Sequence, residues 1–277
     1  MTIVSRYAAL SLLLLLPVAA FAQAPSGWAQ GFHSRVRLVS GGPEGSGHLA
    51  GIEIVLDRGF KTYWRQPGES GLPPRFDWSG STNAAAVAVL WPAPHRLEDA
   101  GGVAYVYVDR VVLPVQVTPS DPKKPVELRL ALDYGVCKEI CIPARAEIAA
   151  TLSVSTADAS PADRALVQDL GLARVPRRIP LGGPGPLSVE GVAEAPEGGK
   201  PGFLVTVRGP ADATLFAEGP DDWYVSTSAP TGTGRFRVVI DDKPKDAGGP
   251  VTLRLTLAAG SEAIESDLDL DEALRPR

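Results

Sequence analysis

The chain has 277 residues, a formal net charge of −5 and 44% hydrophobic residues, with 29 glycines and 26 prolines. A weakly acidic chain lacks the basic surface that binds nucleic acid or an anionic membrane, so we expect no nucleic-acid partner. The hydrophobic fraction is sufficient for a packed core, whereas so many glycines and prolines disfavour long helices. Composition therefore predicts an all-β chain of short strands.

The first 22 residues have the pattern of a secretory signal peptide. Arg6 supplies a positive charge, residues 8–20 are apolar, and Ala20 and Ala22 offer small residues at a cleavage site. An uncleaved membrane anchor is the alternative, but the apolar stretch is shorter than the ~20 residues that span a bilayer. We therefore predict an exported protein that is soluble in the periplasm after cleavage, without membrane insertion.

A first series of short predicted strands follows the signal segment. Apolar and polar residues alternate along most of them, as is typical of half-buried strands. The predicted strands cover residues 34–40, 48–56, 85–90, 103–108, 111–117, 126–134 and 144–153. This density of strands predicts a β-sandwich, which we assign to residues 27–155.

The composition changes after this unit. Ser160 and Pro161 are typical of a helix start, and apolar residues on one helical face predict a short helix that ends before Pro176. An Arg-, Gly- and Pro-rich stretch follows, so we assign residues 156–186 to the helix and a linker. Further strands are predicted at residues 187–192, 202–208, 214–218, 223–226, 235–240, 251–258 and 263–269. They indicate a second, smaller β-sandwich over residues 187–270.

Cys137 and Cys141 are the two cysteines of the sequence, and they lie in the connection between the predicted strands 126–134 and 144–153. Closing so short a ring stabilises a fold by only about 2 kcal/mol, which favours a functional pair. Three alternatives remain open. The pair is redox-active, or it is a structural disulfide in a non-catalytic interaction module, or it binds Cu(I) through soft thiolates. The second unit has neither cysteine nor histidine, so we expect the chemistry in the first.

Three motifs in order resemble the amino-terminal periplasmic domain of the DsbD family of thiol:disulfide interchange proteins, and its ScsB-like relatives more closely. They are residues 59–71 (GFKTYWRQPGESG), 91–94 (WPAP) and 134–143 (YGVCKEICIP). The resemblance covers residues 27–155. It implies an immunoglobulin-like sandwich whose Cys137 and Cys141 cycle between dithiol and disulfide, and we expect no cofactor and no resident metal.

The resemblance also implies partners. In the family this domain accepts electrons from a transmembrane domain and passes them to periplasmic oxidoreductases of thioredoxin fold. The sequence ends at Arg277 with no segment that resembles such a transmembrane domain. We therefore expect a separate membrane-embedded thiol reductase as electron donor and a periplasmic thioredoxin-fold oxidoreductase as acceptor.

The family's cap loop, which shields the cysteine pair, is expected just before the strand at 103–108. Its residues would be Glu98, Asp99, Ala100, Gly101 and Gly102. Ala100 and Gly101 stand where the family typically carries aromatic residues. The resemblance therefore implies a cap that shields the pair less than usual.

Overall fold

The computed structural model describes residues 27–69, 71–99, 102–155, 159–230, 232, 234–245, 247 and 250–277. The predicted signal peptide, residues 1–22, lies outside the described residues. No helix in the described ranges is long and apolar enough to cross a membrane.

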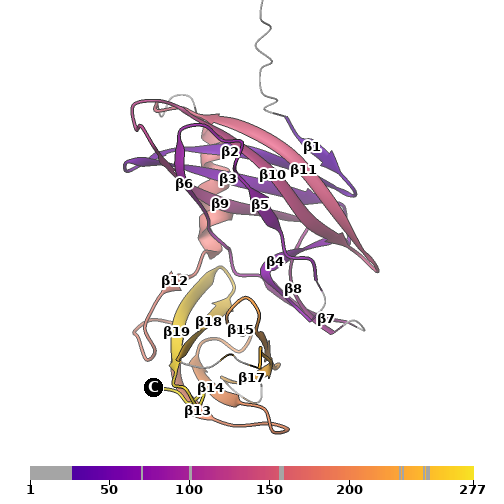
Figure 1. Ribbon diagram of the computed structural model, residues 1–277, viewed down its shortest axis with the longest axis vertical. Helices are drawn as coiled ribbons and strands as arrows, with labels where there is room; N and C mark the ends of the chain where they lie inside the picture. The colour runs from indigo at the N-terminus through magenta and orange to yellow at the C-terminus, as the bar shows by residue number, and fades with distance from the viewer. Residues whose placement is uncertain are drawn as a thin grey trace, which may run out of the picture.

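The first unit consists of two sheets, drawn from indigo to pink in Figure 1. One has the order β1-β2-β3-β9-β6, with β1 (Ala29–Gly31), β2 (Ser34–Glu44), β3 (Gly47–Leu56), β9 (Arg110–Pro119) and β6 (Ala84–Val89). The other has the order β11-β10-β4-β8-β7, and β5 also pairs with β10. Its strands are β11 (Cys141–Leu152), β10 (Val126–Cys137), β4 (Lys61–Gly68), β8 (Gly102–Val108), β7 (His95–Asp99) and β5 (Arg75–Asp77).

A single hydrophobic core lies between these two sheets. On β10, Leu128, Leu130 and Leu132 are buried and alternate with more exposed residues, so one face of the strand points into the core. Val36 and Ile52 contribute from the opposite sheet to the same cluster. The predicted immunoglobulin-like β-sandwich is confirmed.

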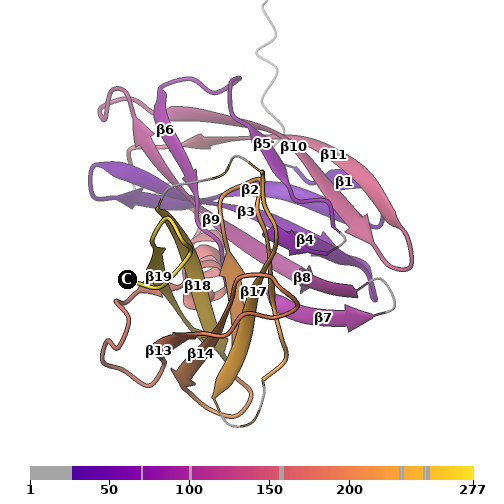
Figure 2. The ribbon, with the colours of Figure 1, turned by 60° about the horizontal axis from the view of Figure 1, so that its bottom comes forward.

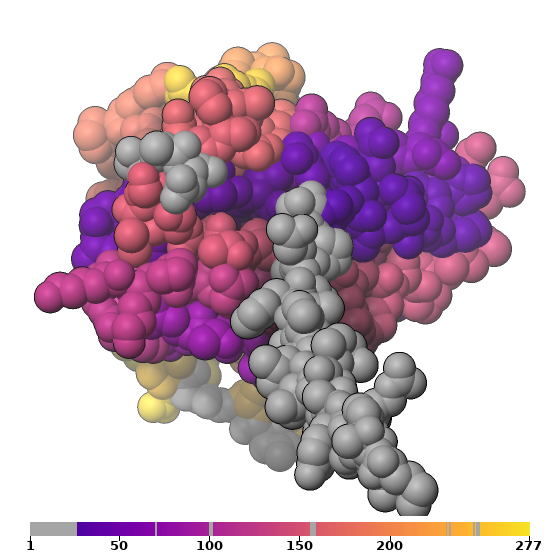
Figure 3. Space-filling model, turned by 90° about the horizontal axis from the view of Figure 1, so that it is seen from above, coloured from indigo at the N-terminus to yellow at the C-terminus, as the bar shows by residue number. Residues whose placement is uncertain are grey.

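A helical segment covers the outer face of the first sheet. The Ser160 side chain accepts a hydrogen bond from the Asp163 amide and caps the segment, as its sequence predicted. The segment consists of α1 (Pro161–Ala165), the π-helical η2 (Leu166–Gly171) and the 3₁₀-helical η3 (Leu172–Arg174). Buried Val167 packs with Leu49 and Val112 of the sheet, and Figure 3 shows the segment lying directly against the first unit.

The second unit is the predicted smaller β-sandwich of two four-stranded sheets, drawn in orange and yellow (Figure 2). One sheet contains β12 (Arg177–Arg178), β19 (Glu262–Leu270), β18 (Val251–Ala259) and β15 (Thr214–Glu218). The other contains β13 (Ser188–Glu194), β14 (Gly202–Arg208), β17 (Arg235–Asp242) and β16 (Tyr224–Thr227). β12 lies within the segment expected as a linker and pairs in parallel with β19. That segment is therefore tied to the second unit by backbone hydrogen bonds.

Candidate functional site

The two cysteines end one strand and begin the next. β10 finishes at Cys137, β11 starts at Cys141, and the two residues are antiparallel partners joined by a disulfide, with Cα atoms 4.2 Å apart. The sequence placed both residues in a loop. The strands reach further because β10 and β11 pair along their whole length, from Val126 and Leu152 to the cysteines themselves. Three residues, 138–140, connect the strands, so the cysteines are held by sheet pairing.

The two sulfur-bearing residues differ in accessibility. Cys137 is 1% exposed and packs in a small cluster with Tyr63, Ala104 and Val106, whereas Cys141 is exposed. Thiol–disulfide exchange requires that an incoming sulfur reach the bond from outside. Cys141 is therefore the side of the disulfide that a partner can approach.

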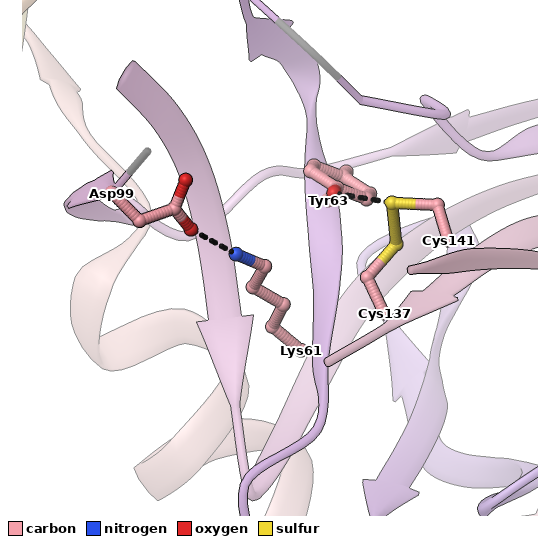
Figure 4. Close-up of a disulfide and its surroundings, with 5 residues drawn as sticks. All are labelled: Lys61, Tyr63, Asp99, Cys137 and Cys141. Atoms are coloured by element: carbon pink, nitrogen blue, oxygen red, sulfur yellow. Dashed lines mark hydrogen bonds and ion pairs between the residues drawn. A yellow bond between two sulfur atoms is a disulfide. The ribbon is translucent and has the colours of Figure 1, made fainter. Parts of the chain in front are cut away.

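Tyr63 on β4 contacts the accessible sulfur. Its hydroxyl lies 2.9 Å from Cys141 Sγ, and it is the donor because a disulfide sulfur carries no proton (Figure 4). The side chain is 2% exposed. Burial, assisted by the negative charge of Asp99, raises the pKa of Tyr63 above its ordinary value, so the hydroxyl keeps its proton at neutral pH. Sequence reasoning included Tyr63 in a motif but gave it no role.

Two glycines leave room for the Tyr63 ring. A β-carbon at Gly71 would lie 2.6 Å from the ring atom Cδ1, and one at Gly135 would lie 3.2 Å from Cδ2. Gly71 belongs to the motif at 59–71, and Gly135 precedes Cys137 by two residues on β10. Each motif therefore supplies a glycine to the space that the Tyr63 ring occupies beside the disulfide.

Of the predicted cap residues, Glu98 and Asp99 lie at the end of β7 and Gly102 begins β8, and Asp99 is linked to the site. Lys61, the β4 partner of Cys137, bonds Asp99 Oδ2 through its Nζ at 3.0 Å (Figure 4). Exposed Glu98 pairs with Arg96, and Gly102 begins β8. Ala100 and Gly101 lie outside the described residues, so shielding of the disulfide by the cap stays a prediction.

The charges near the cysteines are partly compensated. Lys138 Nζ lies 5.8 Å from the centre of the Phe60 ring, whereas Arg145 is engaged by Asp133 and Glu147 at 3.3 Å. Arg145 therefore adds little net positive charge near Cys141. Among the described residues, no group of three or more His, Cys, Asp or Glu side chains is arranged to hold a metal ion.

Comparison with known proteins agrees with this geometry. Residues 35–153 match the family described as Thiol:disulfide interchange protein DsbD, N-terminal. The crystal structure of the N-terminal periplasmic domain of ScsB from Proteus mirabilis is similar in fold, with a TM-score of 0.67 and 20% identity. That likeness covers 89% of this chain and 98% of the other, so it extends over both sandwiches. No curated protein matches the chain in sequence. The segment that matches the DsbD N-terminal family contains both Cys137 and Cys141.

Proposed function

We propose that the chain is a periplasmic thiol–disulfide exchange module. It would receive electrons from a separate membrane-embedded thiol reductase and pass them to a thioredoxin-fold oxidoreductase through Cys137 and Cys141. The observation that carries the proposal is an accessible Cys141 bonded to a buried Cys137, within the segment that matches the DsbD family. The similar Proteus mirabilis structure is that of a periplasmic domain, which supports the compartment.

The proposed exchange uses the cysteines in a fixed order. In the reduced form, the Cys141 thiolate attacks the partner's disulfide, forms a mixed disulfide and releases one partner thiolate. The Cys137 sulfur then attacks Cys141 Sγ, which closes the internal disulfide and releases the second partner thiolate. Two electrons pass to the partner, and the two protons lost by the cysteines are taken up by its thiolates. A donor dithiol reverses the same steps on the internal disulfide.

The Tyr63 hydroxyl would stabilise the thiolate of Cys141, the attacking cysteine. Its hydroxyl already donates to Cys141 Sγ in the disulfide form. A hydrogen bond to an ionised acceptor is roughly twice as strong as one to a neutral acceptor, so the contact would favour the thiolate over the thiol. In the reverse direction, the same hydroxyl would stabilise the charge that develops on Cys141 as it leaves the disulfide.

A redox titration tests whether the bond is exchangeable. We expect the full chain, equilibrated with glutathione buffers, to give a reduction potential above about −300 mV, the upper range of structural disulfides in secreted proteins. A potential below this value would contradict the proposal and favour an interaction module with an inert disulfide. Stoichiometric Cu(I) binding by the reduced chain, with slow exchange, would favour the metal-binding alternative instead.

Single-cysteine variants test the order of attack. Cys137→Ser keeps the accessible thiol, so we expect it to accumulate mixed disulfides with an oxidised thioredoxin-fold protein. Cys141→Ser is the matched control, because it keeps only the buried thiol, and we expect it to trap far less. Equal trapping would contradict the assigned order, and no trapping by either variant would contradict exchange itself.

A further inference from the structure

The second sandwich contacts the same strand that carries Tyr63. Three consecutive residues of β4 have different surroundings: Tyr63 contacts the disulfide, Trp64 enters the sandwich core, and Arg65 bonds residues of the second unit. Figure 1 shows β4 at the end of the first sandwich that lies nearest the second. The strand is therefore a direct structural connection between the redox pair and the second unit.

Aromatic packing forms the first part of this connection. Phe216 of β15 is 1% exposed and belongs to the core cluster of the first unit. Its ring centre lies 5.7 Å from that of Trp64 and 5.0 Å from that of Tyr105, in tilted and edge-on arrangements that aromatic pairs prefer. Trp64 is fully buried. A side chain of the second unit thus fills space in the core directly behind β4.

A partly buried ion-pair network forms the second part of this connection. The Arg65 guanidinium donates to both carboxylate oxygens of Glu218, at 2.7 and 2.6 Å, and also to Glu265 Oε1 at 2.6 Å. The side chains of Arg65, Glu218 and Glu265 are only 21%, 13% and 9% exposed. A bidentate arginine–carboxylate contact of this kind fixes the orientation of the guanidinium as well as its distance. Arg65 is therefore held from two strands, β15 and β19, of the second unit.

We propose that the second sandwich is a positioning element for the redox pair, in which Phe216, Glu218 and Glu265 fix β4 and thereby hold the Tyr63 hydroxyl against Cys141. The inference rests on the proposed function for its biological meaning. The structural claim itself is independent of that function. Arg65 and Tyr63 are two positions apart on β4, so a shift of Arg65 displaces the Tyr63 hydroxyl. A displacement of about 1 Å is sufficient to weaken the 2.9 Å hydrogen bond between the Tyr63 hydroxyl and Cys141 Sγ.

Alkylation of Cys141 in the reduced full chain measures this coupling without any partner protein. In Glu218→Gln we expect the alkylation rate near pH 7 to fall by about threefold and the pH midpoint of the reaction to move upward, because fewer thiolates form. Tyr63→Phe should move both quantities in the same direction. The double variant should equal Tyr63→Phe alone, because the ion pair acts through the hydroxyl.

Glu190→Gln is the matched control, since Glu190 also pairs with an arginine, Arg208, within the second unit, but on strands β13 and β14, which supply neither of the carboxylates that bond Arg65. It should leave the alkylation profile unchanged. Arg65→Lys keeps the charge but loses the bidentate contact, and it provides a second test of the inference if Glu218→Gln folds poorly. A folded Glu218→Gln or Arg65→Lys with the wild-type profile would overturn the inference, as would additive effects in the double variant.

These experiments test the exchange function and the positioning role independently of each other. A wild-type chain that does not exchange with an oxidised thioredoxin-fold protein contradicts the proposed function. The alkylation profiles of the same samples still decide whether the second sandwich positions Tyr63. Conversely, normal exchange with unchanged alkylation in the folded anchor variants contradicts the positioning role alone.

Discussion

At the scale of single residues, the site depends on one asymmetry and one hydrogen bond. Cys137 is buried and Cys141 is exposed, although the two are direct cross-strand partners. Tyr63 donates its hydrogen bond to the exposed member of the pair. The arrangement gives the two sulfurs unequal environments, which is what an ordered attack and resolution require.

Replacing the Tyr63 hydroxyl should slow the attack by Cys141. A hydrogen bond to a charged group contributes about 1.5 kcal/mol or more, so we expect Tyr63→Phe to lower the thiolate fraction, and the alkylation rate near neutral pH, by about tenfold. Stopped-flow alkylation of the reduced chain measures this rate. Tyr134→Phe is the control, because its hydroxyl bonds Ser34 at 2.8 Å instead of a sulfur. Equal rates in wild type and Tyr63→Phe would contradict the role of the hydroxyl.

At the scale of strands, alternation of buried and exposed residues made β10 predictable, whereas β4 lacks this alternation. β10 alternates buried and partly exposed residues, and both it and its partner were predicted. β4 was not, because Thr62, Tyr63 and Trp64 are buried in succession and its register with β8 is interrupted after Tyr63. A strand buried on both faces gives no period-two signal. The hydroxyl that contacts Cys141 was missed for this reason.

Tertiary pairing explains a further strand that the sequence did not predict. β12 is only two arginines long, and its partner β19 lies more than eighty residues away. The helix start at Ser160 was predicted because capping is local, whereas the π-helical turn that follows depends on packing of Val167 against the sheet. The cysteine spacing indicated a short ring, but unequal burial of the two sulfurs results from strand register.

The close approach of β10 to its neighbours makes Gly135 sensitive to substitution. A β-carbon there would lie 2.8 Å from Leu72 Cβ and 3.2 Å from Tyr63 Cδ2. We expect Gly135→Ala to destabilise the fold by about 1–3 kcal/mol, the usual cost of overpacking, measured as a lower urea midpoint. Gly191→Ala is the matched control on strand β13, since nothing lies within 4 Å of its added carbon. Equal midpoints for the two variants would show that the ring space tolerates a methyl group.

At the scale of the whole molecule, the two sandwiches are joined through the core as well as through the chain. Phe216, Ala258 and Ala263 come from the second unit but belong to the core cluster of the first. Arg65 adds partly buried ion pairs across the same contact. The sequence indicated two units with chemistry confined to the first. The structure places side chains of the second unit directly behind the strand that contacts the redox pair.

The same burial predicts how stability depends on alkaline pH. All five tyrosines of the described residues have a raised pKa, with burial as the largest cause, and that of Tyr224 rises to about 12. Unfolded tyrosines ionise near pH 10, so above this pH the unfolded chain loses protons that the folded chain retains. Stability from tyrosine burial is therefore complete below about pH 10 and decreases as the pH rises toward the folded values.

Urea unfolding between about pH 8 and 12 should show this loss, since a difference of one pKa unit between folded and unfolded states corresponds to about 1.4 kcal/mol. Tyrosinate absorbance separates the tyrosines from other titrating groups, because the native chain should titrate at higher pH than the chain in concentrated urea. Coincident native and denatured tyrosinate curves would mean that the five hydroxyls are accessible to solvent. That outcome would also contradict the burial of the Tyr63 hydroxyl in the contact between β4 and the disulfide.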